Sequence, residues 1–194
     1  MSLLDPTLIP GYAEATRQEQ EARDLAFLGL PIPLCGIIVR QFTPRHLILL
    51  TRCRNRFLVG GVPQSEDIAA FLWQVSTAYA PGDAAGRVEL FRSLKVDYAA
   101  AVAEIRAYLA AVFQDAPKGR GPSKLYTSAM AYLVHTLAKE YGWDDDAILE
   151  KPLARLWQYY RHLESVYSPN AAQFNPSDRL MAEWLKTVNE RGQN

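Results

Sequence analysis

Apolar side chains recur at steps of three and four residues along most of this chain, which is the spacing of one face of an α-helix. Typical start and stop residues bound these stretches: Thr43-Pro44 and Ser65 favour helix starts, and Gly29 and Gly142 favour helix ends. On these signals we expect helices over residues 13–28, 44–55, 65–79, 83–114, 123–142, 144–167 (bent near Lys151-Pro152) and 176–190.

The longest predicted helix covers residues 83–114, which contain no proline and a single glycine, Gly86. Its apolar stripe consists of Val88, Phe91, Leu94, Tyr98, Val102, Ile105 and Leu109. Residues 30–42 differ, because two prolines disfavour a helix and the β-branched residues 37–39 favour a short extended piece. We therefore predict an all-α fold: an irregular helical bundle of about six to seven helices, with one long central helix and little or no β structure.

One segment interrupts the helical pattern. Residues 115–122, DAPKGRGP, are rich in proline, glycine and charge, which is typical of a linker. The GRGPSK stretch at 119–124 also resembles a phosphate-binding loop, but its spacing is not G-x-x-x-x-G-K-[ST] and no strand precedes it. We expect an N-terminal helical part over 1–114 and a C-terminal helical part over 123–194 that pack together as one compact unit.

Composition and charge narrow the class of partner. Hydrophobic residues make up 49% of the chain, as in folded globular proteins. Basic and acidic residues both number 21 and no basic block is present, which disfavours nucleic acid as a partner. The two cysteines are too few for a disulfide framework, the first residues lack a signal-peptide pattern, and no apolar run reaches the roughly 18 residues of a membrane span. We expect a cytoplasmic protein that does not enter a membrane.

Two groups of residues suggest a metal or catalytic site. The three aspartates at 144–146 would suit a hard cation, but they also fit the N-cap and first turn of a helix, where the helix dipole stabilises negative charge. Cys35, His46 and Cys53 lack the paired spacing of a zinc site, so core thiols and a surface imidazole are the simpler interpretation. No G-x-S-x-G turn is present. We expect a non-enzymatic protein without cofactor or metal.

Aromatic residues supply the main candidates for a contact surface. Residues 151–167 place apolar and aromatic side chains on one helical face, which is more often a core face than a binding surface. Aromatic rings are nevertheless dense between residues 141 and 160, and large rings commonly anchor protein partners. The candidates for partner contact, some of which we expect in the core, are Trp143, Trp157, Tyr159 and Tyr160, with a basic cluster of Arg52, Arg54 and Arg56 whose simpler interpretation is a solvated helix end.

The aromatic region also carries a family resemblance. Residues 139–143, KEYGW, are followed by a short acidic helix start and then by PLAR at 152–155 and LWQYY at 156–160. This order resembles the C-terminal signature of tail assembly chaperones encoded by tailed bacteriophages and prophages. Residues 50–81 also resemble the N-terminal part of some of these proteins.

The resemblance implies a small helical protein that binds the long, largely helical tape measure protein, keeps it from aggregating and helps the tail tube proteins polymerise around it. Such chaperones are commonly absent from the finished particle. A neutral, aromatic-rich helical chain also suits helix-in-groove recognition. Two alternatives stay open: a DNA-binding regulator, in which residues 144–150 and the next helix form a helix-turn-helix that offers Arg155, Gln158 and Arg161, and a structural component that stays in the particle.

Overall fold

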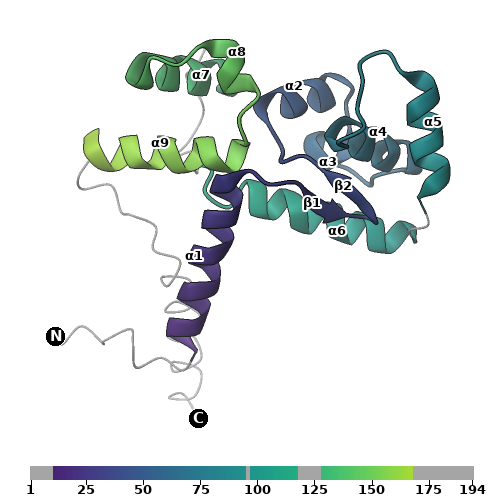
Figure 1. The fold of residues 1–194 in the computed structure, drawn as a ribbon, viewed down its shortest axis with the longest axis horizontal. Coiled ribbons are helices and arrows are strands. Elements are labelled where there is room, and N and C mark those ends of the chain that lie inside the picture. The colour runs from purple at the N-terminus through teal and green to yellow at the C-terminus, as the bar shows by residue number, and fades with distance from the viewer. Residues whose placement is uncertain (1–10, 95–96, 118–127, 168–194) are drawn as a thin grey trace. The chain divides into compact units, whose positions relative to one another are not determined.

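The computed structural model describes residues 11–94, 97–117 and 128–167 of the chain (Figure 1). Within them the elements are α1 (Tyr12–Leu28), β1 (Ile32–Leu34), β2 (Ile37–Val39), α2 (Pro44–Arg52), α3 (Arg56–Val59), α4 (Ser65–Val75), α5 (Ala84–Ser93), α6 (Tyr98–Val112), α7 (Ala129–Tyr141), α8 (Asp145–Leu149) and α9 (Leu153–Tyr167). The described chain is mostly helical, as the sequence predicts, and a single two-stranded sheet accompanies its helices.

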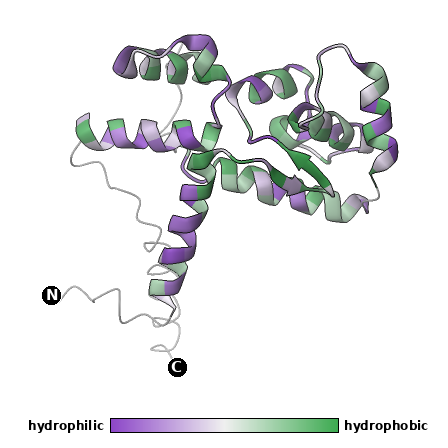
Figure 2. Cartoon of the chain, in the orientation of Figure 1, coloured by the Kyte–Doolittle hydropathy of each residue, from purple (hydrophilic) through white to green (hydrophobic). Residues whose placement is uncertain are grey.

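The chain divides into two compact units, residues 1–25 with 164–194 and residues 26–163. The first unit contains most of α1, which is hydrophilic along most of its length and has no buried residue (Figure 2). The carboxylate of Glu14 accepts hydrogen bonds from Arg17 and Gln18, at 2.6 and 2.8 Å, so contacts within the helix support it. The second unit contains the hydrophobic core.

Phe42, on the connection between β2 and α2, lies at the centre of this core and is 1% exposed. Its ring stacks on Phe71 of α4 at 5.9 Å between centroids and meets Tyr108 of α6 edge-on at 6.4 Å. Its carbonyl accepts a hydrogen bond of 2.7 Å from the backbone N–H of Leu153, the first residue of α9. One residue thus contacts α4, α6 and α9, and the 26–163 unit includes residues from both sides of the predicted linker.

A tight hairpin joins β1 to β2. The strands pair antiparallel, with Leu34 opposite Ile37 and Pro33 opposite Ile38. The turn residues Cys35 and Gly36 have φ values of 50° and 77°, and positive φ at both central positions is typical of the two-residue turns that match strand twist. The expected extended piece at residues 37–39 is confirmed as β2. The sequence did not predict its partner β1, because a proline in a strand argues against pairing.

Hydrogen bonds attach the hairpin to two helices. The backbone N–H of Cys35 donates to the carboxylate of Glu104 on α6, at 2.8 Å, and α6 lies beside the hairpin (Figure 1). On the β2 side, Ser76 forms a bridge with Val39 just after the end of α4. The hairpin therefore fixes the end of α4 relative to α6.

The prediction of one long central helix over residues 83–114 is wrong. α5 ends at Ser93 and α6 begins at Tyr98. Leu94 and Asp97 have extended backbone, with ψ values of 117° and 140°, and the carboxylate of Asp97 accepts a hydrogen bond of 3.1 Å from the N–H of Ala100. Aspartate is unfavourable inside a helix and strongly favoured at an N-cap, so it starts a new helix here instead of continuing the old one.

Other helix boundaries also differ from the sequence prediction. α2 ends at Arg52 and is followed by the short helix α3, whereas one helix to residue 55 was predicted. The predicted helix over 65–79 ends at Val75, because Ser76 takes an extended backbone with ψ 144°. Ser65 is the first residue of α4, and the N-cap of this helix is Gln64. The backbone N–H of Gln64 donates a hydrogen bond to the carboxylate of Asp67. The predicted bent helix over 144–167 is two helices, α8 and α9.

Three predicted helix ends are confirmed. The hydroxyl of Thr43 accepts from the N–H of His46 at the start of α2, and the carboxylate of Asp144 accepts from the N–H of Ala147 at the start of α8. Gly142 ends α7 with φ 65°. The proposed helix start at residue 123, most of the predicted linker and the helix over 176–190 lie outside the described residues.

Candidate functional site

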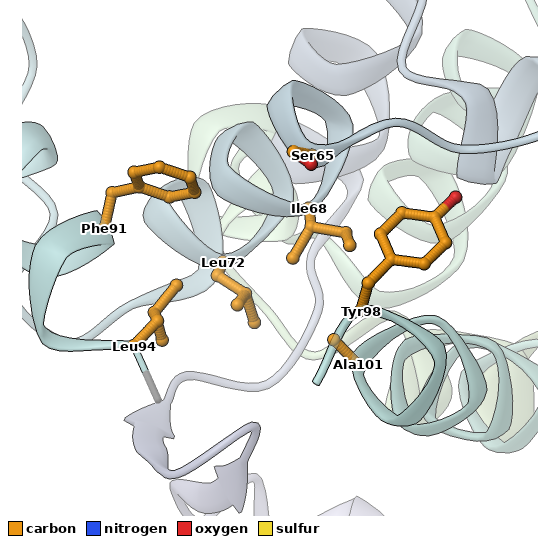
Figure 3. A pocket seen from close by; sticks show the side chains of 7 residues that line it. All are labelled: Ser65, Ile68, Leu72, Phe91, Leu94, Tyr98 and Ala101. Carbon is orange, nitrogen blue, oxygen red and sulfur yellow. The ribbon is translucent and has the colours of Figure 1, made fainter. Parts of the chain in front are cut away.

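A pocket of about 240 Å³ opens between α4, α5 and α6. Figure 3 shows the side chains of all three helices around this hollow. Its lining consists of Ser65, Ile68 and Leu72 from α4, Phe91 and the adjoining Leu94 from α5, and Tyr98 and Ala101 from α6.

The pocket has a buried apolar floor and exposed aromatic walls. On the floor Leu72 is fully buried and Ala101 is 2% exposed, whereas Phe91 and Tyr98 are 47% and 44% exposed. Pockets for drug-sized ligands commonly measure about 300–1,000 Å³, so this one is small for such a ligand. Its size and apolar lining suit one or two large apolar side chains of another protein.

Local contacts explain why the three helices leave this hollow. The hydroxyl of Tyr98 donates a hydrogen bond to the carbonyl of Pro63, which fixes the ring at the mouth of the pocket. A Cβ on Gly86 of α5 would lie 3.0 Å from the ring of Trp73 on α4, so glycine permits close packing of these two helices. The break after Leu94 then lets α5 and α6 approach α4 as separate helices.

None of the residues that line this pocket was among the contact candidates predicted from the sequence. Phe91, Leu94 and Tyr98 were assigned to the stripe of one continuous helix, and their helical spacing gives no sign of the break. The available signal was Asp97, a strong N-cap residue in the middle of the stripe.

A second feature, the aromatic cluster, brings together two of the predicted contact residues. It consists of Phe27, Tyr141, Trp143 and Tyr159 in the 26–163 unit. Trp143 stacks on Tyr141 at 4.8 Å between centroids, and Tyr159 lies 4.9 Å from Trp143, 5.3 Å from Tyr141 and 5.4 Å from Phe27. None of these four residues is buried. Burial, with Tyr159 and Glu140 nearby, raises the pKa of Tyr141.

Two cations lie over rings of the aromatic cluster. The Nζ of Lys151 is 4.8 Å from the ring centroid of Trp143, and the guanidinium carbon of Arg155 is 5.1 Å from that of Phe27. The Nε of Arg155 also donates a hydrogen bond to the carbonyl of Phe27. These distances are those of cation–π interactions, which hold the two cations at defined positions.

The other two aromatic candidates differ in burial. Trp157 is a core residue, 6% exposed, and its Nε1–H finds no acceptor among the described residues. The structure therefore gives it a packing role and no exposed face for a partner. Tyr160 is half-buried and meets Tyr132 edge-on at 6.4 Å.

The basic cluster predicted from the sequence surrounds the junction of α2 and α3. Arg52 is exposed in the last turn of α2, and Arg54 is exposed with φ 54° in the following turn. Arg56 forms an ion pair of 3.3 Å with Asp67 of α4. None of the three lines the pocket.

The cysteine and histidine candidates are separate groups with different environments. Cys35 is a core thiol, as expected, and burial raises its pKa to about 12. Cys53 is exposed, so the expectation of a core thiol is wrong there. His46 is 8% exposed, so the expectation that its imidazole lies at the surface is wrong. Across residues 11–94, 97–117 and 128–167, no three His, Cys, Asp or Glu side chains gather as metal ligands would.

None of the helices that the structure describes combines the length and the hydrophobicity needed to span a membrane. Comparison with protein-family models, with curated proteins and with solved structures finds no match.

Proposed function

We propose that this protein is a tail assembly chaperone of a tailed bacteriophage or prophage, and that it binds the tape measure protein during tail assembly. The observation that carries the proposal is the apolar pocket between α4, α5 and α6, which would receive apolar side chains of a helical partner. The choice of the tape measure protein as partner is supported by the motifs at residues 139–160 and 50–81, which resemble those of tail assembly chaperones.

The pocket suits helix-in-groove recognition. A partner helix of this kind presents apolar anchors at positions i, i+3, i+4 and i+7, and only the anchors need to enter the groove. Phe91 and Tyr98 at the mouth would pack against the stem of the anchor, while Leu72 forms the floor. Burying one large apolar side chain contributes about 1.5–3 kcal/mol, which is modest enough for a chaperone that must release its partner.

Residues 139–160, the segment that resembles the chaperone signature, also contribute to the fold. Gly142 ends α7 in the left-handed conformation, and Trp143 and Tyr159 join the aromatic cluster. Part of this signature is therefore explained by structure, and the exposed part of the cluster is a second candidate for partner contact.

The test is co-expression with the tape measure protein, taken as the long, predicted-helical protein encoded beside this one, followed by affinity purification through a tag on this chain. The wild-type protein should keep the tape measure protein in the soluble fraction and co-purify with it. Phe91→Ser should reduce the recovered partner, because it removes a pocket wall that is already 47% exposed and so has little effect on folding.

The matched control is Ile48→Ser, which removes an apolar side chain on α2 that is 43% exposed and does not line the pocket. It should leave recovery unchanged, with thermal unfolding of both variants close to that of the wild-type protein. Equal recovery with Phe91→Ser and the wild-type protein, or recovery of nucleic acid alone, would contradict the proposal.

The alternative of a DNA-binding regulator gains little from the structure. Of the residues that a helix-turn-helix would offer to DNA, Arg155 contacts Phe27 and Arg161 forms an ion pair of 2.5 Å with the buried Asp115. A structural component of the particle is distinguished from a chaperone by mass spectrometry of purified particles, since a chaperone should be absent from them.

A further inference from the structure

Lys151 and Arg155 are two cations without a carboxylate partner among the described residues. Arg45, Arg56 and Arg161 all form ion pairs there. Lys151 and Arg155 are instead placed over aromatic rings, at 4.8 and 5.1 Å from the ring centroids. Their charge is therefore held in position but not neutralised.

Three of the acidic residues close to Lys151 in the sequence interact with other groups. Asp146 and Glu150 both pair with Arg45 of α2. Asp144 accepts a hydrogen bond from the N–H of Ala147 as the N-cap of α8. The acidic start of α8 thus does not supply the missing counter-charge.

The positions of the two cations are electrostatically unfavourable in the isolated protein. Arg155 lies in the first turn of α9, and Lys151 lies two residues before α9 begins at Leu153. The N-terminal end of a helix carries partial positive charge, which disfavours cations. A carboxylate bound beside either cation would supply the counter-charge that the described residues do not provide.

We propose that the aromatic cluster, together with Lys151 and Arg155, binds an acidic amphipathic helical segment of a protein partner. Carboxylates of the segment contact the two cations, and its apolar side chains pack on the exposed parts of Phe27 and Trp143. The inference rests on the proposed function and adds the charge of the bound segment: the tape measure helix that docks here is acidic.

The contacts of the rings favour a protein over nucleic acid. Binding of single-stranded nucleic acid relies on bases that stack on free faces of aromatic rings. Trp143 already stacks on Tyr141 and lies under Lys151, while Phe27 lies under Arg155. Contacts within the protein thus already cover Trp143 and one face of Phe27, which suits apolar and carboxylate side chains better than stacked bases.

The experiment measures fluorescence anisotropy with two designed probes. One is a fluorescein-labelled helical peptide with leucine at i, i+3, i+4 and i+7 and glutamate at the flanking positions, and the other carries lysine in place of glutamate. The wild-type protein should bind the acidic peptide at least about tenfold more tightly than the basic one, a difference that added salt reduces.

Two charge-reversal variants locate the contact. Lys151→Glu should weaken binding of the acidic peptide by about tenfold and strengthen binding of the basic peptide, because it reverses the charge beside Trp143. Arg106→Glu, which makes the same change at an exposed position on α6, should alter neither. Equal affinity for both peptides, no binding of the acidic peptide, an equal effect of Arg106→Glu, or tighter binding of a single-stranded oligothymidine would each overturn the inference.

Co-purification of the tape measure protein separates this inference from the proposed function. Loss of the partner with Phe91→Ser but not with Lys151→Glu would uphold the function and overturn the acidic contact. Lys151-dependent binding of the acidic peptide without capture of any tape measure protein would uphold the contact and overturn the function.

Discussion

Acidification should destabilise this protein through His46, and His46→Gln should remove that sensitivity. His46 is 8% exposed, and its Nδ1 accepts a hydrogen bond of 3.1 Å from the backbone N–H of Thr43. The imidazole also lies 5.7 Å from the ring of Phe42. Protonation at Nδ1 would remove this acceptor and place a charge inside the core.

Burial is the main cause that lowers the pKa of His46, to about 4 from an ordinary 6.5. The surrounding charges act in both directions: Glu150 raises the pKa, while Arg40 and Arg45 lower it. Between pH 6.5 and 4 the unfolded chain binds a proton that the folded chain does not, so stability falls with pH in this window. At about 1.36 kcal/mol per pKa unit, the total loss is about 3 kcal/mol, complete near pH 4 and absent above pH 6.5.

The assay is urea unfolding of the wild-type protein, His46→Gln and His135→Gln at several pH values from 7 to 4. Glutamine at this third helical position keeps a side-chain acceptor for the N–H of Thr43 and does not titrate. Because the carboxylates titrate in all three proteins, the difference between them isolates His46. His46→Gln should lose about 3 kcal/mol less than the wild-type protein over this range. His135 is exposed on α7, so His135→Gln should follow the wild-type protein.

Identical pH dependence of the wild-type protein and His46→Gln would refute the argument. So would an NMR titration in which the imidazole of His46 takes up its proton near pH 6.5, because the proton would then cause no loss of stability on acidification.

Three further predictions concern stability, each measured by urea or thermal unfolding. Trp157→Ala should destabilise the fold by about 3–5 kcal/mol, because the ring is 6% exposed, and unchanged stability would contradict its place in the core. Asp97→Ala should cost about 1 kcal/mol through loss of the α6 N-cap, whereas Asp97→Asn should cost little, and equal losses would argue against capping. Gly29→Ala should destabilise the fold more than Gly82→Ala. Both glycines have positive φ, but only at Gly29 would the new Cβ lie 2.7 Å from the side chain of Pro152. Equal losses of stability would exclude that contact.

Features decided by a few neighbouring residues could be predicted from the sequence. Thr43, Asp144 and Gly142 end or begin helices as expected, because capping depends on one side chain or one backbone conformation. The break between α5 and α6 was missed because the apolar spacing continues across it, so periodicity alone cannot separate one helix from two. The paired strand β1 was missed because its proline is tolerated only where no N–H is required.

The sites depend on contacts between distant segments, which the sequence pattern does not contain. The contact candidates Trp143 and Tyr159 lie together in the aromatic cluster, and Phe27 joins them from a segment far earlier in the chain. The pocket exists only because α4, α5 and α6 meet around it. His46 was expected at the surface, yet its capping hydrogen bonds and its contact with Phe42 allow burial.

The proline in the hairpin has a consequence for solubility. Backbone groups of successive strand residues point alternately to the two sides, and the residues that flank a two-residue turn point towards one another. The backbone N–H and C=O groups of Ile32 and Leu34 therefore point towards β2. Pro33 alone directs its backbone to the outer edge of β1, and proline has no N–H to donate there. No described strand covers that edge. A second chain that approached it would find no backbone donor, so the hairpin is protected against the edge-to-edge pairing through which exposed strands aggregate.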